Sequence, residues 1–351
     1  MSAHTASHAL TDETPLGAVL LRVEDLERQF RLDGDLLVRA VDGVTLEIPE
    51  GTTFGLVGES GSGKSTLARL MLRLDTPTAG RILFEGTDLV ERSGKDLRRL
   101  RRQMQIVFQD PFAALNRRKT VEQIVSLPLQ VHEPGMSRAA RRARVAELLE
   151  LVGLRPEHAQ AYPRQLSGGQ CQRVSIARAL ALGPKFVVLD EAVSAVDVSI
   201  QAQILNLLRD LQQQLGLTYL FVTHDLSVVR YMADTVGVMY LGRIVEIGSR
   251  ETLFDSPQHP YTHALLASIP SVEHRREHVA SKLTLREAPG ADAGTITGCR
   301  FHPRCPLGTR DVCRTVDPSL HETQRGHAVA CHFPQSEQSL LAAAGDTEAA
   351  P

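Results

Sequence analysis

A glycine-rich segment near residue 60 has the residue types and spacing of a phosphate-binding loop. Residues 58–66 read G-E-S-G-S-G-K-S-T, a full match to the pattern G-x-x-x-x-G-K-[ST]. Glycines let backbone N–H groups turn towards phosphate oxygens, while Lys64 would reach the β- and γ-phosphates and the Ser65 hydroxyl would help to hold Mg²⁺. The expected nucleotide contacts in this phosphate-binding loop are Gly58, Glu59, Ser60, Gly61, Ser62, Gly63, Lys64, Ser65 and Thr66.

Further polar side chains follow apolar runs that are typical of buried parallel strands. Asp190 and Glu191 follow the run 186–189, and His224 and Gln109 each follow a similar run. Parallel strands present their carboxyl ends at one edge of a sheet, so these side chains should gather beside the phosphate-binding loop. We expect Asp190 to hold Mg²⁺, Glu191 to orient or deprotonate the attacking water, and His224 to contact the γ-phosphate. Gln109 is placed to reach Mg²⁺ or a water.

The segment 166–170 offers a second anion-binding helix terminus. Ser167 can cap a helix that begins there, and Gly168 and Gly169 leave backbone N–H groups accessible at its positive end. One chain has no evident need for two triphosphate cradles. This terminus would therefore serve a nucleotide held by a partner.

An α/β fold is expected to position these groups. An apolar strand over 54–57 precedes the phosphate-binding loop, and a helix follows it. Strands over 20–26 and 38–48 indicate a small separate sheet, and helical spacing between about 120 and 152 indicates a helical insertion. Phe30, just before the turn of the small sheet, is either a core residue or an aromatic that stacks on a base.

Composition narrows the class of protein. The 351 residues include 39 basic and 41 acidic side chains, for a formal net charge of −2, so nothing favours nucleic-acid binding. No apolar run approaches the roughly 18 residues of a membrane-spanning helix. Residues 1–17 are polar and lack the apolar core of a signal peptide, so we expect a disordered lead-in there.

Taken in order, these motifs resemble the nucleotide-binding subunits of ABC transporters over about residues 20–270. In this resemblance Gln109 matches the Q-loop, segment 166–170 the signature and segment 194–197 the D-loop, while Glu191 is the catalytic glutamate. The resemblance implies a P-loop NTPase fold with a small antiparallel β subdomain, a helical subdomain and a cysteine-bearing C-terminal extension. The nucleotide contacts that it adds are Phe30, Gln109, Ser167, Gly168, Gly169, Gln170, Asp190 and Asp197.

The mechanism implied by the resemblance is a head-to-tail dimer with ATP sandwiched at the interface. Each nucleotide lies on one phosphate-binding loop and faces the signature of the other subunit. The residues implied in catalysis are Lys64, Gln109, Glu191 and His224, and the Mg²⁺ ligands are Ser65, Gln109 and Asp190. Two departures from the family pattern are Ala192, where proline is usual, and Val196, where leucine is usual.

Several stretches resemble oligopeptide/dipeptide importer ATPases in particular: 57–66, 108–112, 199–203 and 256–262. This narrower resemblance implies two polytopic permease subunits, an extracytoplasmic solute-binding protein and a second, homologous ATPase, with the chain on the cytoplasmic face of the membrane. Segment 193–195 resembles the F-type rather than the D-type ATPase partner. Peptides are the expected cargo, with nickel chelates or glycosides as alternatives.

Two rival functions remain at this point. A soluble ABC ATPase in repair or translation generally carries two cassettes or a long coiled-coil insert, and this chain has one cassette. A non-hydrolysing subunit is disfavoured by the intact Lys64, Glu191 and His224. The expected organisation is a lead-in over 1–17, an ATPase domain over 18–255 with its helical subdomain at about 111–180, an extension over 256–335 and a disordered tail over 336–351.

Four of the five cysteines crowd into the extension, at Cys299, Cys305, Cys313 and Cys331. Some relatives in the resembling group carry a [4Fe–4S] cluster there, and four thiolates suit such a cluster. Zinc is an alternative, with His302 and His332 as substitute ligands, although the usual C-x₂₋₄-C pairs are missing. Unligated cysteines are the third alternative. Cys171, in the signature helix, is interpreted as a packing residue.

Overall fold

The structure, a computed structural model, describes residues 17–31, 37–194, 196–268, 296–308 and 310–334. The predicted lead-in, apart from Gly17, and the predicted tail over 336–351 lie outside the described residues. The same holds for the turn predicted at residues 33–35. The predicted domain boundaries stay predictions.

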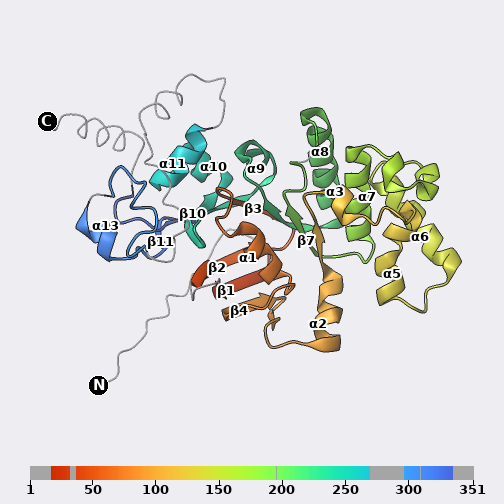
Figure 1. The fold of residues 1–351 in the computed structure, drawn as a ribbon, viewed down its shortest axis with the longest axis horizontal. Coiled ribbons are helices and arrows are strands. Elements are labelled where there is room, and N and C mark those ends of the chain that lie inside the picture. The colour runs from red at the N-terminus through yellow and green to blue at the C-terminus, as the bar shows by residue number, and fades with distance from the viewer. Residues whose placement is uncertain (1–16, 32–36, 195, 269–295, 309, 335–351) are drawn as a thin grey trace.

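One sheet of eight strands forms the centre of the molecule (Figure 1), in the order β11-β12-β10-β9-β3-β8-β7-β6. Its parallel part runs from β9 to β6 and confirms the predicted α/β class. At the other side, β9, β10, β12 and β11 pair antiparallel, so strands of the C-terminal extension continue the same sheet. The strand bounds are β3 Thr53–Val57, β6 Met104–Val107, β7 Phe186–Asp190, β8 Thr218–Val222, β9 Thr235–Tyr240, β10 Arg243–Ser249, β11 His321–Gln324 and β12 His327–Val329.

A second, antiparallel sheet has the order β2-β1-β4-β5. Its strands are β1 Val19–Arg31, β2 Leu37–Pro49, β4 Ala79–Phe84 and β5 Thr87–Asp88. β1 is longer than predicted, so Phe30 lies inside the strand and pairs with Val38 of β2. The apolar faces of this sheet and of α1 (Lys64–Met71) share one core, which joins the small sheet to the phosphate-binding loop.

The helical insertion contains five helices, and the second, third and fourth of them divide the stretch over about 120–152 whose spacing indicated helix. They are α3 Pro111–Ala114, α4 Val121–Val125, α5 Leu127–His132, α6 Arg138–Leu151 and α7 Gly168–Leu180. Pro128 occupies the first turn of α5, where its missing N–H is tolerated, and this separates α4 from α5. Gly153, with φ of +69°, follows α6 in the left-handed conformation typical of a helix end.

The remaining helices lie around the two sheets and within the extension (Figure 1). They are α2 Gly94–Leu100, α8 Val198–Leu215, α9 Leu226–Met232, α10 Arg250–Asp255, α11 Pro260–Ala267 and α13 Asp311–Thr315, with 3₁₀ turns at Arg101–Gln103, Pro156–Gln160 and Pro163–Gln165. The extension packs on the sheet through a shared core in which Phe301 and Leu307 meet Tyr240 and Tyr261. Within the described ranges, no helix combines the length and the apolar character needed to cross a membrane.

Candidate functional site

The phosphate-binding loop connects β3 to α1 and holds its lysine within the loop. Lys64 Nζ donates to the carbonyl oxygens of Gly58 and Glu59, each at 2.8 Å, and to Ser62 Oγ at 3.4 Å. Burial lowers the pKa of Lys64, while the carboxylates of Glu191, Asp190 and Glu59 act to raise it. A cation is therefore fixed at the start of α1, where exposed N–H groups already favour an anion.

Two glycines of the loop are required by close backbone packing. A Cβ at Gly63 (φ +104°) would lie 2.1 Å from the carbonyl oxygen of Ala40. A Cβ at Gly58 (φ +153°) would lie 2.1 Å from the carbonyl oxygen of Met239. The loop thus passes against β2 and β9 at distances that only glycine permits.

The end of β7 brings a carboxylate to the loop. Ser65 Oγ donates to Asp190 Oδ1 at 2.9 Å. Burial raises the pKa of Asp190, an effect that the hydrogen bond from Ser65 opposes and the charge of Glu191 reinforces. A hydroxyl and a carboxylate side by side are hard oxygen donors of the kind that Mg²⁺ shares with phosphate and water, so these two residues fit the predicted ion.

Glu191 and His224 meet across the ends of β7 and β8. His224 Nδ1 lies 3.3 Å from Glu191 Oε1. Glu191 has φ of +48°, which is unusual for a residue with a side chain. Its backbone is held in this conformation because its N–H donates to the Val222 carbonyl at 2.9 Å and its carbonyl accepts from Ser194 N–H at 3.1 Å. A contact to the neighbouring strand and a local turn thus hold the backbone from which the Glu191 carboxylate extends.

Other predicted site residues lie on separate elements. Gln109 is exposed just beyond β6, and Asp197 is exposed just before α8. Ala195, in the predicted D-loop, lies outside the described residues. Phe30 is partly buried, with the guanidinium of Arg28 4.5 Å from its ring centroid, so one face of the ring is already covered.

The signature segment forms a capped helix start away from the phosphate-binding loop. Ser167 Oγ accepts from Gln170 N–H at 3.3 Å, and Gln170 Oε1 accepts from Ser167 N–H at 3.0 Å. α7 packs against α3, α4, α6 and α8, whereas α1 packs against β2, β7 and β8 (Figure 1). A single chain therefore keeps the signature residues Ser167, Gly168, Gly169 and Gln170 apart from Lys64.

The four cysteines of the extension lie close enough to influence one another. Burial raises the pKa of Cys305 and Cys331 to about 12, and the neighbouring cysteines add to the increase. Cys299 N–H donates to the Cys313 carbonyl at 2.9 Å. Among the residues that the structure describes, however, no three His, Cys, Asp or Glu side chains form a group that could hold a metal ion. As placed, Cys305 and Cys313 are buried and Cys299 and Cys331 half-buried, and the four do not form the predicted metal site.

The histidines considered as zinc ligands have other partners. His302 Nδ1 lies 2.9 Å from the Cys299 carbonyl oxygen, and His332 Nε2 lies 2.8 Å from that of Val316. Cys171 is fully buried in the core of the helical part, where burial raises its pKa to about 11. This position agrees with its interpretation as a packing residue.

Two residues to which the sequence analysis gave no role contact the phosphate-binding loop directly. Glu59 N–H donates to Tyr261 Oη at 2.8 Å. Arg304 Nη1 and Nη2 donate to Glu59 Oε2 and Oε1 at 2.8 and 3.0 Å. The partners are 202 and 245 residues apart in the chain, so no local pattern could have indicated these contacts.

Comparisons with known proteins agree with this geometry. The ABC transporter family matches residues 41–194, and the oligopeptide/dipeptide transporter C-terminal region matches residues 245–313. The chain is similar to the oligopeptide transport ATP-binding protein AppF of Bacillus subtilis (strain 168), with 46% identity over 321 residues, which cover 90% of this chain and 97% of AppF.

Solved structures show the same fold. The ATP-binding cassette MJ0796, in a dimeric post-hydrolysis state bound to ADP and Pi, matches with a TM-score of 0.60 and 32% identity, over 66% of this chain and 98% of that one. CbiO1 from Clostridium perfringens, part of the ABC transporter complex CbiONQ, matches with a TM-score of 0.60 and 33% identity, over 67% of this chain and 90% of its own. The chain therefore belongs to the ATP-binding proteins of the ABC transporter family and carries the C-terminal region of the oligopeptide/dipeptide transporters.

Proposed function

We propose that this chain is the ATP-hydrolysing subunit of a bacterial importer for di- or oligopeptides. The observation that carries the proposal is the coexistence, in one chain, of a nucleotide edge formed by Lys64, Asp190, Glu191 and His224 with the oligopeptide/dipeptide C-terminal region. AppF, which is similar across 90% of this chain, is an oligopeptide transport ATP-binding protein. Both halves of the proposal thus have independent support.

At the nucleotide edge, each side chain has a chemical task. Lys64 balances phosphate charge, and Ser65 and Asp190 would hold Mg²⁺, which neutralises the charge that develops on the transferred phosphoryl group. Glu191 accepts a proton from the attacking water. His224, 3.3 Å from Glu191, holds that carboxylate and the γ-phosphate in register.

The separation of the signature from the phosphate-binding loop supports a two-subunit site. A second ATPase in head-to-tail orientation would bring its Ser167 equivalent to the γ-phosphate on this chain. Val198, beside Asp197, is 82% exposed, so an apolar side chain is available to a partner next to the predicted D-loop. MJ0796, which shares the fold, was solved as a dimer. We propose a second, homologous ATPase of a different sequence as the partner, with this chain as the F-type member.

The chain would sit on the cytoplasmic face of the membrane, bound to two polytopic permease subunits that receive cargo from an extracytoplasmic binding protein. Exposed apolar side chains suit such a contact. Phe108, immediately before Gln109, is 36% exposed, and Leu127 and Val131 of α5 are 41% and 45% exposed. A permease helix could cover these side chains in the manner of a helix in a groove.

Affinity purification of the tagged protein from its own membranes in mild detergent tests this proposal. We expect two polytopic chains, a second ATPase and a solute-binding protein to co-purify, and the complex to take up labelled peptides in proteoliposomes. A complex with Glu191→Gln should retain these partners and lose uptake. Recovery of ribosomal or DNA-repair proteins alone would contradict the importer and favour a soluble ABC ATPase. Uptake of a nickel chelate or glycoside in place of peptides would reject peptides as the cargo and leave the importer proposal standing.

We also propose that the cysteines of the extension ligate a [4Fe–4S] cluster after a local rearrangement. The support is that four cysteines gather in the extension, where Cys299 N–H donates to the Cys313 carbonyl at 2.9 Å and neighbouring cysteines act to raise the pKa of Cys299, Cys305 and Cys331. Cluster binding requires thiolates, so it would displace four protons. Anaerobically purified protein should contain about four iron atoms and four labile sulfides per chain. Colourless, iron-free protein from the same preparation would reject the cluster.

A further inference from the structure

We propose that Arg304 of the extension is a positioning residue for the nucleotide site, because it holds Glu59 and through it the phosphate-binding loop in the form that binds ATP. The inference rests on the nucleotide site proposed above. It makes the extension a working part of that site, although Arg304 itself does not touch the nucleotide.

The extension contacts the loop at Glu59, and the backbone and side-chain polar groups of Glu59 are all hydrogen-bonded. Its N–H donates to Tyr261 Oη at 2.8 Å, and its carbonyl accepts from Lys64 Nζ at 2.8 Å. Its carboxylate accepts two hydrogen bonds from Arg304. Such a bidentate pair fixes direction as well as distance. The orientation of the Glu59 peptide, and with it one of the partners of Lys64, is therefore set from outside the loop.

The guanidinium of Arg304 is itself rigidly seated. Its side chain is only 10% exposed, and its Cζ lies 5.8 Å from the ring centroid of Tyr240 and 5.9 Å from that of Phe301. The rings of Tyr240, Tyr261 and Phe301 pack together with centroids 4.7 to 5.4 Å apart. One aromatic cluster thus supports both groups that bind Glu59.

The position of the Arg304 side chain depends on the conformation of the segment between Cys299 and Cys305. Cys305 N–H donates to the Phe301 carbonyl at 3.0 Å, which closes a turn around Arg304. A second contact ties the same segment to the loop. Arg300 donates to the carbonyl of Leu241, and the next residue, Gly242, donates its N–H to the Ser62 carbonyl at 2.8 Å.

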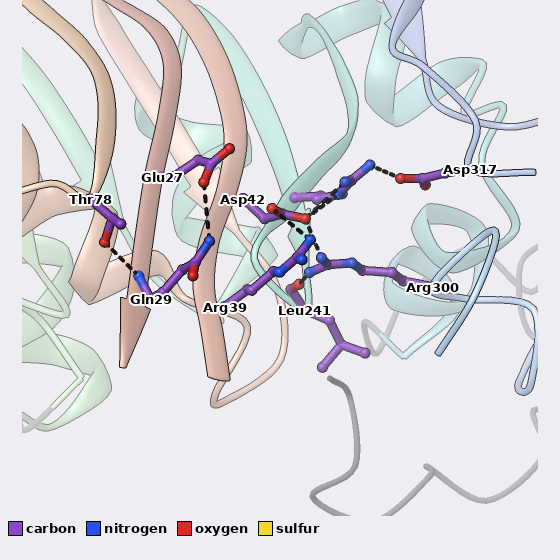
Figure 2. Close-up of polar contacts among 9 residues, drawn as sticks. Glu27, Gln29, Arg39, Asp42, Thr78, Leu241, Arg300 and Asp317 are labelled. Atoms are coloured by element: carbon purple, nitrogen blue, oxygen red, sulfur yellow. Dashed lines mark hydrogen bonds and ion pairs between the residues drawn. The ribbon is translucent and has the colours of Figure 1, made fainter. Parts of the chain in front are cut away.

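Figure 2 shows how Arg300 is anchored. The buried carboxylate of Asp42, on β2, pairs with Arg300, with Arg39 at 3.6 Å and with Arg243 at 2.8 Å, and Arg243 also pairs with Asp317 of the extension. Asp42 is 6% exposed and Arg300 12%, so this pair lies where most solvent is excluded. The segment 299–305 therefore contacts the loop directly at Glu59 and indirectly at Ser62, through Leu241 and Gly242, and it is also fixed to β2 through Asp42.

Loss of the Arg304 contact should weaken ATP binding more than catalysis. Without this contact the backbone at Glu59 can rotate, so the loop adopts the ATP-binding conformation only part of the time. The apparent affinity for ATP then falls in proportion to the population of that conformation. The chemical step uses Glu191 and His224, to which no residue of the described part of the extension forms a hydrogen bond or ion pair. The expected signature is thus a higher Kd for ATP with little change in kcat.

The test uses the complete transporter with Arg304→Met, which keeps an apolar side chain against Tyr240 and Phe301 but removes the charge. We expect the Kd of a fluorescent ATP analogue to rise about fivefold, equivalent to about 1 kcal/mol, with kcat at saturating ATP within twofold of wild type. Arg304→Lys should restore part of the affinity. Arg314→Met, an exposed arginine of the same extension, serves as the matched control and should bind ATP normally.

A double-mutant cycle with Glu59→Gln decides whether the effect passes through this pair. If it does, the double variant should bind ATP no more weakly than either single variant. Wild-type Kd in Arg304→Met, or additive losses in the double variant, would overturn the inference. If Arg304→Met fails to fold, Glu59→Gln alone must raise Kd, since it leaves the extension unchanged. Lys64→Ala distinguishes failure of this inference from failure of the proposed nucleotide site. If Lys64→Ala still binds ATP, the proposed nucleotide site is rejected. If Lys64→Ala loses ATP binding and Arg304→Met binds ATP normally, only the role of Arg304 is rejected.

Discussion

The nucleotide edge and the C-terminal extension treat their polar side chains in opposite ways. At the edge, the His224 side chain is 59% exposed and has Glu191 as a partner at 3.3 Å. Where the extension packs on β10, His327 of the extension and Glu246 of β10 are both 0% exposed, and His327 Nε2 lies 2.7 Å from Glu246 Oε1. The backbone N–H groups of Gln258 and His259 also donate to Glu246, at 2.7 and 3.0 Å.

This difference in exposure and hydrogen bonding agrees with a ligand site at the edge and a stabilising role for the buried side chains. Side chains at the edge keep free hydrogen-bonding capacity for a ligand, so their contribution to stability is small. Side chains in the extension use their capacity within the protein, because a buried charge without partners would cost several kcal/mol. Substitutions at the edge should therefore reduce turnover without unfolding, and substitutions in the extension should do the reverse, except at Arg304.

The largest effect is expected from Glu191→Gln at the edge. Glutamine cannot accept the proton of the attacking water, so ATP turnover should fall at least about 100-fold while ATP binding is retained. Steady-state hydrolysis and equilibrium binding measure the two quantities separately. Glu150→Gln, an exposed glutamate at the end of α6, is the matched control with unchanged turnover. Hydrolysis that survives Glu191→Gln would reject Glu191 as the general base.

The same substitution in both regions gives the next largest effect. His327→Ala leaves the buried Glu246 carboxylate without its hydrogen bond to His327 and should lower the free energy of unfolding by about 3 kcal/mol. His224→Ala should change it by less than about 0.5 kcal/mol, since it removes an exposed side chain. Urea unfolding of the two variants measures both values. Equal losses of stability in the two variants would contradict the conclusion that the edge contributes less to stability than the extension.

Acid should destabilise the extension through His259, which is 1% exposed. Burial lowers the pKa of His259 from 6.5 to about 4. Between these values the unfolded chain binds more protons, so stability is complete above pH 6.5 and falls as the pH drops towards 4, by up to about 1.4 kcal/mol per pH unit. Urea unfolding at several pH values measures this slope. His259→Gln should reduce it, and an unchanged slope would exclude His259 as its source.

Glu246 should add to the acid sensitivity at lower pH. Burial alone would raise its pKa, but hydrogen bonds from His327, Thr262 and the backbone N–H groups of Gln258 and His259 outweigh burial and lower it below 4.5. Its contribution to stability is therefore present above pH 4.5 and is lost as the pH falls through the lowered pKa. The nucleotide edge has no buried histidine of this kind among its described residues, so it should not share this sensitivity.

The smallest effect is expected from Ala192→Pro, which restores the residue usual in the family. The turn after β7 is held by the N–H and carbonyl of Glu191, which bond to Val222 and Ser194 and do not involve the substituted residue. Turnover should change by less than about twofold. A larger loss in steady-state hydrolysis would mean that φ at position 192 is incompatible with proline.

Local sequence was sufficient for the features whose causes are local. The glycine pattern before Lys64 and the capping pair Ser167 and Gln170 act over a few residues, so their conformations are predictable from residue types alone. The apolar runs before Asp190 and His224 likewise indicated a parallel sheet, which the strand order confirms. The roles assigned to the site residues themselves stay predictions.

Only the tertiary structure decided the features whose partners are remote in the chain. Composition and spacing could not show that β12 pairs with β10, that Glu246 lies against His327 or that Arg304 grips Glu59, because these partners are 81 or more residues apart. Which distant side chains meet depends on how whole elements pack to bury their apolar faces. The same packing decided that the cysteine-bearing extension completes the sheet and reaches the phosphate-binding loop.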